Sequence, residues 1–235
     1  LILDAASAVI PTRHKVGLVG RNGVGKSTLL RLILGDAVPE AGSVSVPRHA
    51  RIGTVAQEAP SGEESLIDTV LAADLERTAL LEEADNASDP GRIADIQMRL
   101  VDIASHSAPA RAAQILAGLG FRVDEIEGPC SALSGGWRMR VALAAALFAA
   151  PDVLLLDEPS NDLDLEGVIW LKSYIRAYPA TVVIVSHDRD LLNDVAGSIL
   201  LLERGKLTLY QGNYDSFERQ RREQQALTSK LRKKQ

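Results

Sequence analysis

The chain has 235 residues, of which 46% are hydrophobic and 24% are charged, and its formal net charge is -5 at pH 7. This length suits one large α/β domain or one domain with an inserted subdomain, and the apolar fraction is sufficient for a buried core. The sequence lacks a signal-peptide pattern and any apolar run of about 18 residues, and its single cysteine, Cys130, excludes an internal disulfide. We therefore expect a soluble protein of the cytoplasm with no membrane insertion.

The first elements are predicted from short apolar runs separated by turn residues. The chain begins with Leu rather than Met, and residues 1–10 read as a strand, so we expect a fragment that starts inside a domain. The apolar run Val16–Val19 predicts a second strand, and the spacing of apolar residues at 29–34 predicts a helix that Gly35 closes.

A glycine-rich loop connects this strand to this helix and has the spacing GxxxxGK[ST]. Its glycines bring backbone N–H groups close to phosphate oxygens, Lys26 reaches the β- and γ-phosphates, and the Ser27 hydroxyl can bind Mg²⁺. The alternative is an ordinary glycine turn before a helix. This alternative is disfavoured because Gly, Gly, Lys and Ser all occupy the positions of the motif between the predicted strand and the predicted helix. The predicted ATP-binding residues are Gly20, Arg21, Asn22, Gly23, Val24, Gly25, Lys26, Ser27 and Thr28.

The middle of the chain predicts two more strands and then a block of helices. We expect strands near 42–46 and 51–56, the second ending at Gln57. A capping-box pattern at Ser61 and Glu64 predicts a helix that runs towards Ala84. Helices are also expected over 93–103, after a break at 89–91, and over 109–119. This block is a helical insertion between strands of an α/β core.

A second candidate phosphate cradle opens an alanine- and leucine-rich helix that ends before Pro151. Ser134, Gly135 and Gly136 offer a hydroxyl and bare backbone N–H groups at that helix N-terminus. One ATP cannot easily use both cradles of a single domain. The economical arrangement is two domains facing head to tail, each presenting this motif to the nucleotide held by the other.

Two unbroken apolar strands, 153–156 and 181–185, carry polar residues at their carboxyl ends, where open α/β sheets place ligands. After the first strand, Asp157 is predicted to join Ser27 in holding Mg²⁺, and Glu158 to orient and deprotonate the attacking water. The alternative is that both carboxylates cap a helix. The phosphate loop upstream makes this the weaker interpretation. After the second strand, His187 is predicted to bind the γ-phosphate and position the water, a structural histidine being the alternative.

Gln57 is the remaining candidate ligand. At the end of its predicted strand, its amide would reach the metal or the attacking water, so Gln57 belongs to both the metal set and the catalytic set with Glu158 and His187. The alternative is an ordinary glutamine at the edge of a sheet.

The C-terminal region predicts a hairpin over 199–210, turning at Arg204-Gly205, and then a charged helix. From residue 219 onward, the sequence has one acidic residue, Glu223. The basic residues of this segment are Arg219, Arg221, Arg222, Lys230, Arg232, Lys233 and Lys234. This is a basic arm on an acidic body, and it is either a solvated helix face or a surface for nucleic acid. Composition does not distinguish RNA from DNA.

With these residues in order, the chain resembles the ATPase domains of ATP-binding cassette (ABC) proteins. The motifs that carry the resemblance are the loop 20–28, Gln57, the signature Leu133–Gly136, the strand end Asp157-Glu158, the loop Ser160–Asp164 and His187. The resemblance implies an α/β P-loop NTPase with a mostly parallel core sheet, N-terminal antiparallel strands and a helical subdomain at about 59–150. It also implies an ATPase with ATP and Mg²⁺ as ligands, which needs a second cassette for full activity.

Other motifs of the chain resemble those of the ABC-F branch, whose soluble members carry two cassettes in one polypeptide and act on ribosomes. They are Trp137, Asn161 with Leu163-Asp164, Ser186–Arg189 and Tyr210–Phe217. By this resemblance, residues 1–217 form the first cassette and 218–235 begin a basic linker helix that lies near ribosomal and transfer RNA. The partner cassette belongs to the same full-length chain or to a second copy of this one.

Two other functions remain open at this stage. The chain resembles the ATPase subunit of a membrane transporter in the same motifs, although the basic terminal helix argues against that function. A nucleotide-dependent scaffold without catalysis is disfavoured by the intact Lys26, Asp157, Glu158 and His187. The chain departs from the ABC pattern in lacking an aromatic residue before the phosphate loop, and in having Ser160 and Asp162 where Thr and His are usual.

Overall fold

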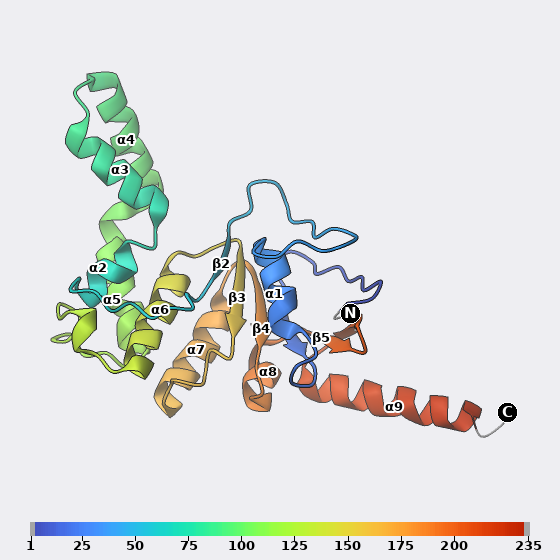
Figure 1. The fold of residues 1–235 in the computed structure, drawn as a ribbon. Coiled ribbons are helices and arrows are strands. Elements are labelled where there is room, and N and C mark those ends of the chain that lie inside the picture. The colour runs from blue at the N-terminus through green and yellow to red at the C-terminus, as the bar shows by residue number, and fades with distance from the viewer. Residues whose placement is uncertain (1–2, 233–235) are drawn as a thin grey trace. The chain divides into compact units, whose positions relative to one another are not determined.

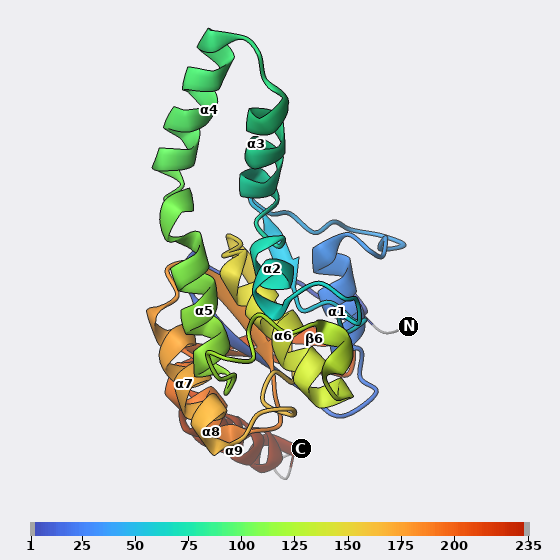
Figure 2. The same cartoon turned by 90° about the vertical axis from the view of Figure 1, so that its left-hand side faces the viewer.

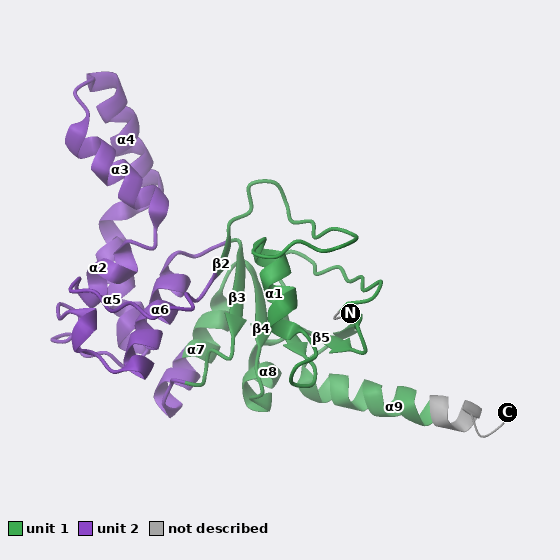
Figure 3. Ribbon diagram, viewed as in Figure 1, with its two compact units in different colours: residues 1–53, 152–161, 171–235 green, residues 54–151, 162–170 purple. Residues whose placement is uncertain are grey.

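The computed structural model describes residues 3–232, and the side chains up to residue 227. The chain separates into two compact units (Figure 3). Unit 1 comprises residues 1–53, 152–161 and 171–235, and unit 2 comprises residues 54–151 and 162–170. The helical insertion thus interrupts an α/β core, and one boundary between the units falls inside a helix.

A six-stranded sheet, almost all of it in unit 1, forms the core of that unit (Figure 1). In order across the sheet, the strands are β2 (Ile52–Thr54), β3 (Val153–Asp157), β4 (Thr181–Val185), β1 (Lys15–Val19), β5 (Ser198–Glu203) and β6 (Lys206–Gln211). β3, β4, β1 and β5 pair in parallel, and β6 pairs antiparallel to β5 through a hairpin turn at Arg204-Gly205. The mostly parallel α/β sheet and the hairpin were both predicted correctly.

Apolar residues cover both faces of the sheet, as expected for parallel strands. Helix α1 (Lys26–Leu34) places Leu29 and Leu30 against one face, in a cluster with Val16 and Leu18 of β1. The other face, near β5 and β6, packs against Phe217 in the first turns of α9 (Tyr214–Arg232). α1 ends at Leu34, and Gly35 is its C-cap in a left-handed conformation, so Gly35 closes the helix as predicted.

The carboxyl ends of three neighbouring strands lie level with one another. In the register of the sheet, Val185 of β4 pairs with Asp157 of β3 on one side and with Leu18 of β1 on the other. The residues that follow these three strands therefore emerge at a single edge. This alignment positions the candidate site.

Unit 2 is built from helices (Figure 2). They are α2 (Leu66–Leu71), α3 (Leu75–Asn86), α4 (Pro90–Asp102), η1 (Ser105–Ser107), α5 (Ala108–Gly118), η2 (Cys130–Ala132) and α6 (Gly135–Phe148). α2, α5 and α6 pack on one another and bury apolar side chains such as Val70, Leu116 and Ala144. α3 buries no residue, and ion pairs from Glu76 and Glu83 connect it to α4.

Two helices follow the strands of unit 1. α7 (Leu165–Ala177) begins in unit 2 and ends in unit 1, and α8 (Arg189–Val195) follows β4, with Asp188 capping its first turn through the backbone N–H of Leu191. α9 runs without interruption from Tyr214 through the predicted start of the linker at 218. Within the described residues, no helix is both long enough and apolar enough to cross a membrane.

The N-terminal antiparallel strands expected from the sequence are not formed in the described residues. Residues 3–10 and 42–46 adopt no strand, and the strand predicted over 51–56 is shortened to β2, which ends before Gln57. Residues 3–10 and 42–46 are largely exposed, and they pair with no strand of the described sheet. Their local β-propensity is therefore not sufficient to form a sheet.

The capping box predicted at Ser61 is also wrong. Ser65 caps α2 instead, because its hydroxyl accepts a hydrogen bond from the backbone N–H of Asp68 at 3.1 Å. The helix expected to continue to Ala84 breaks after α2, and Asp74 caps α3 by accepting from the backbone N–H of Arg77 at 3.0 Å. The Asp74 cap competes locally with continuation of the helix beyond α2, as Asp side chains often do.

Gly118 provides a test of packing inside unit 2. A Cβ added at this last residue of α5 would lie 2.0 Å from Cε2 of Trp170. We expect Gly118→Ala to lower the free energy of unfolding by about 1–3 kcal/mol, because the rigid indole must shift. Denaturant unfolding measures this change.

The matched control is Gly135→Ala, since an added Cβ there meets nothing within 4 Å. That variant should change stability by less than about 1 kcal/mol. Equal effects of the two substitutions would contradict the packing argument.

Candidate active site

The loop between β1 and α1 has a backbone that only glycines accommodate well. At Gly20, an added Cβ would lie 2.6 Å from the carbonyl oxygen of Leu202, so no side chain fits. Gly23 and Gly25 have φ angles of 75° and 109°, in the region that other residues rarely adopt. The three glycines therefore maintain a tight turn whose backbone is uncovered by side chains.

The N-terminus of α1 presents positive potential to this loop. Gly25 is its N-cap and supplies no side-chain hydrogen bond, and the first turn contains no acidic residue. Lys26 Nζ donates to the carbonyl oxygens of Gly20 at 2.9 Å and Arg21 at 3.3 Å, so the ammonium group lies over the loop. Free N–H groups, the helix dipole and this ammonium group together fit a phosphate ligand.

A hydroxyl and a carboxylate meet beside the loop. Ser27 Oγ donates to Asp157 Oδ2 at 3.3 Å, which joins the first turn of α1 to the end of β3. Both are hard oxygen ligands, and Mg²⁺ in proteins typically takes one or two such ligands together with phosphates and water. The pair fits Mg²⁺ accompanied by a nucleotide.

Glu158 follows Asp157 in a strained backbone conformation. Its φ angle is 48°, unusual for a residue with a side chain, and such strain concentrates at functional sites. The backbone N–H of Glu158 donates to the carbonyl of Val185 at 2.8 Å, and its Oε2 accepts from the backbone N–H of His187 at 3.2 Å. These bonds fix the carboxylate against the end of β4.

The second carboxylate oxygen of Glu158 faces the imidazole of His187. Oε1 is buried and has no hydrogen-bond partner in the described part of the chain. His187 Nε2 lies 3.5 Å away, which is too long for a strong hydrogen bond and makes an ion pair only if the imidazole is protonated. A buried carboxylate oxygen without a donor next to an exposed histidine is suited to receive a polar ligand or a water.

The structure brings together most of the predicted site in unit 1. The residues at the shared edge are the phosphate loop 20–28, Asp157, Glu158 and His187. The strain at Glu158 and its contact with the His187 backbone were not predicted, because neither leaves a sequence signal.

Gln57 and the signature residues belong to unit 2. Gln57 is exposed and lies three residues beyond the end of β2, so its contact with metal or water stays a prediction. Ser134 is the N-cap of α6, but its hydroxyl makes no hydrogen bond to the helix, and Gly135 has open space around it. A hydroxyl and N–H groups are thus available at this helix N-terminus, as the sequence predicted.

Comparison with known families identifies this arrangement. A family model described as ABC transporter matches residues 3–161, more than half of the chain. The chain belongs to this family. A second model, also described as ABC transporter, matches residues 200–235. ABC ATPase domains bind ATP, usually with Mg²⁺, and hydrolyse it, and they dimerise or pair with a second cassette.

Two relatives resemble this chain over almost its whole length. The "Probable ATP-binding protein YheS" of Haemophilus influenzae is 46% identical over 223 residues, covering 94% of this chain and 35% of the relative. "ABC transporter F family member 3" of Arabidopsis thaliana is 42% identical over 249 residues, covering 95% of this chain and 34% of the relative. These identities are consistent with an ABC-F ATPase cassette, and the chain spans about a third of the length of these relatives.

A solved structure confirms the fold. An ATP-binding cassette in a dimeric post-hydrolysis state with ADP and Pi matches with a TM-score of 0.63 at 22% identity, covering 89% of this chain and 90% of that one.

The close approach at Gly20 gives a test of the ABC phosphate loop. We expect Gly20→Ala to weaken ATP binding at least about tenfold, because the new methyl group must push the loop away from Leu202. Isothermal titration with ATP and Mg²⁺ measures the change.

The control is Gly35→Asn at the C-terminus of α1, where the φ angle of 86° suits asparagine better than other residues with side chains. This substitution should leave ATP affinity within about twofold of the parent. Unchanged affinity in Gly20→Ala would show that the loop tolerates the displacement.

Proposed function

We propose that this ABC domain is the first cassette of an ABC-F protein of the cytoplasm, and that ATP binding and hydrolysis in it gate binding to the ribosome. The observation that carries the enzymatic part is the meeting of Ser27, Asp157, Glu158 and His187 beside the phosphate loop at one edge of the sheet. The support for branch F is the 42% identity to a relative named as an ABC transporter F family member.

Different residues of unit 1 are proposed to bind the phosphates and the metal. In this proposal, loop N–H groups and Lys26 hold the phosphates, and Lys26 exchanges its contacts with the loop carbonyls for phosphate oxygens. Ser27 and Asp157 hold Mg²⁺. When bound, the metal neutralises charge on the phosphates and orients them for displacement. Gln57 is proposed as a further ligand of metal or water.

Glu158 is the proposed general base. Its Oε2 is occupied by the backbone N–H of His187, which leaves Oε1 to accept the proton of the attacking water. The His187 side chain is 62% exposed at the same edge, so it is accessible to the γ-phosphate and can position the water. The strained backbone of Glu158 keeps its carboxylate at this location.

A second cassette completes the proposed reaction. This chain holds one phosphate loop and one signature, in different units. We propose that Ser134, Gly135 and Gly136 bind the γ-phosphate of the nucleotide held by the partner cassette, in the same full-length chain or in a second copy. The free hydroxyl of Ser134 and the open space at Gly135 support this arrangement.

The proposed contact with ribosomal RNA involves α9. Arg221 and Arg222 make ion pairs with Glu203 and Glu218, so their charge is partly satisfied within the chain. Arg219 is exposed and makes no ion pair with another described residue, which leaves it available for a phosphate backbone. The side chains of Lys230 and Arg232, and residues Lys233 and Lys234, lie outside the described part of the structure.

Glu158→Gln tests the proposed base. The amide cannot accept a proton, so we expect ATP turnover of the cassette to fall by about 10² to 10⁴ while ATP binding persists. Phosphate release under single-turnover conditions measures the loss. Glu83→Gln is the control, because Glu83 is an exposed ion-pair partner on α3. Parent-level turnover in Glu158→Gln would remove Glu158 from the mechanism.

Ribosome binding is tested by co-sedimentation of the full-length protein that carries Glu158→Gln. We expect retention on ribosomes with ATP but not with ADP, because the closed state accumulates. Adding Arg219→Gln should weaken retention and reduce its dependence on salt, since one phosphate contact is lost. Arg122→Gln removes the same charge from an exposed pair with Asp124 and serves as the control.

No retention with ATP, in a protein whose parent form hydrolyses ATP, would contradict the ribosome role. Co-purification with a membrane partner would then favour the ATPase subunit of a transporter.

A further inference from the structure

Arg140 is a charged residue buried in the helix that follows the signature. It lies on α6 within unit 2, and its side chain is 9% exposed. The surrounding helix is rich in alanine and leucine, and the arginine did not stand out in the sequence. A buried guanidinium is costly unless every donor has a partner, so its contacts reveal what it holds.

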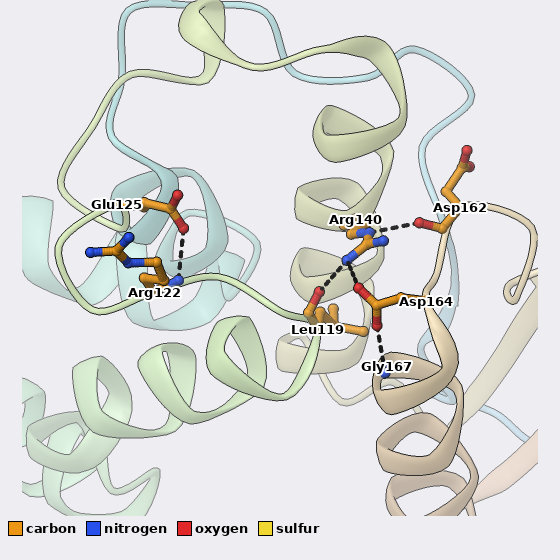
Figure 4. Close-up of polar contacts among 7 residues, drawn as sticks. All are labelled: Leu119, Arg122, Glu125, Arg140, Asp162, Asp164 and Gly167. Carbon is orange, nitrogen blue, oxygen red and sulfur yellow. Dashed lines mark hydrogen bonds and ion pairs between the residues drawn. The ribbon is translucent and has the colours of Figure 1, made fainter.

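Three acceptors from two other segments of unit 2 converge on this guanidinium (Figure 4). Arg140 Nε donates to the carbonyl oxygen of Asp162 at 2.6 Å. Arg140 Nη1 donates to the carbonyl oxygen of Leu119 at 3.0 Å and to Asp164 Oδ2 at 2.9 Å. One side chain thus connects α6 to the end of α5 and to the loop 162–164 that follows Asn161.

An aromatic ring and a glycine complete the pocket. The Arg140 guanidinium lies 4.1 Å from the centroid of the Trp137 ring, whose edge meets Phe121 at a centroid distance of 5.0 Å. Gly120 has a φ angle of 100°, and an added Cβ there would lie 2.9 Å from Arg140 Nη1. The planar shape and five donors of arginine match this pocket, which a lysine cannot fill in the same way.

Asp164 extends the connection into α7. Its Oδ1 accepts from the backbone N–H of Gly167 at 2.9 Å in the first turn of that helix, while its Oδ2 pairs with Arg140. The N–H of Gly167 and then the Arg140 guanidinium hold the pKa of this carboxyl below its ordinary value. The carboxylate is therefore ionised at neutral pH and links two helices.

The same side of α6 carries both Arg140 and a signature glycine. Gly136 precedes Arg140 by four residues, so the two lie on one face of the helix. A Cβ added at Gly136 would lie 3.3 Å from Asp162 Oδ1. The loop 162–164 is thus adjacent to the signature at one end and bonded to Arg140 one turn later.

We propose that Arg140 is a positioning residue that locks the loop 162–164 to the signature helix, so that the two meet the partner cassette as one surface. The proposal rests on the function assigned above, in which the signature binds the nucleotide of the partner. Loss of Arg140 leaves the carbonyls of Leu119 and Asp162 and the Asp164 carboxylate without their common donor. The loop then moves independently of Ser134 and Gly136, and closure of the two cassettes slows.

The test compares Arg140→Met with the parent in the full-length protein. Met retains most of the apolar stem but no donor. We expect amide exchange at residues 162–167 to accelerate about tenfold or more, with exchange in β1 unchanged. We also expect kcat for ATP hydrolysis to fall at least about threefold with KM changed less than twofold, because the phosphate loop belongs to the other unit.

Two further variants make the comparison specific. Arg140→Lys keeps the charge but lacks the planar fork of the guanidinium, so both readouts should lie between those of the parent and Arg140→Met. It also serves if Arg140→Met does not fold. Arg122→Met, a change at an exposed ion pair in the same unit, should alter neither readout.

The outcomes separate this inference from the proposed function. If amide exchange at 162–167 is unchanged in Arg140→Met, the locking role is overturned. If exchange accelerates throughout the protein, Arg140 contributes to global stability and does not lock this loop in particular. Accelerated local exchange with unchanged kcat would overturn the link to catalysis. A parent protein that does not hydrolyse ATP would instead contradict the proposed function, and the exchange measurement would still decide whether Arg140 holds the loop.

Discussion

The candidate site depends on the level alignment of three parallel strands. Because β3, β4 and β1 end side by side, the residues after them must share one edge of the sheet. Residues more than a hundred positions apart, such as Ser27 and Asp157, then come within hydrogen-bonding distance. A slip of one residue in any of these pairings would move the side chains of that strand to the opposite face. The register therefore decides which side chains reach this edge.

Contacts around this edge of the sheet compensate for the backbone strain there. Gly20 lies against the carbonyl of Leu202, and Glu158 adopts a left-handed conformation that costs about 1–3 kcal/mol. Two hydrogen bonds offset that cost locally: Glu158 N–H donates to the carbonyl of Val185, and the Glu158 carboxylate accepts from the N–H of His187. The buried sheet supplies the rest. The rigid sheet thus supports both an open phosphate loop and a fixed carboxylate.

The two units stabilise their functional residues by different means. Unit 1 relies on a sheet with apolar residues on both faces, whereas unit 2 places a buried cation in a network of acceptors. A network of this kind gives up some stability in exchange for a defined geometry, since removing one member leaves the others unpaired. Such a network is well suited to hold a loop next to Gly136 while the ion pairs that connect α3 to α4 remain exposed to water.

The sequence by itself determined the phosphate loop, the two apolar strands and their acidic and histidine ends, the C-terminal hairpin and the ABC family, because these features are local in spacing and type. It did not determine which weak β-segments find a partner, so the strands expected at residues 3–10 and 42–46 were wrong. It also placed a helix cap at Ser61 rather than Ser65, since several polar residues there can serve. Only the tertiary structure showed the strained Glu158 and the buried Arg140, because strain and burial arise from contacts between segments far apart in the chain.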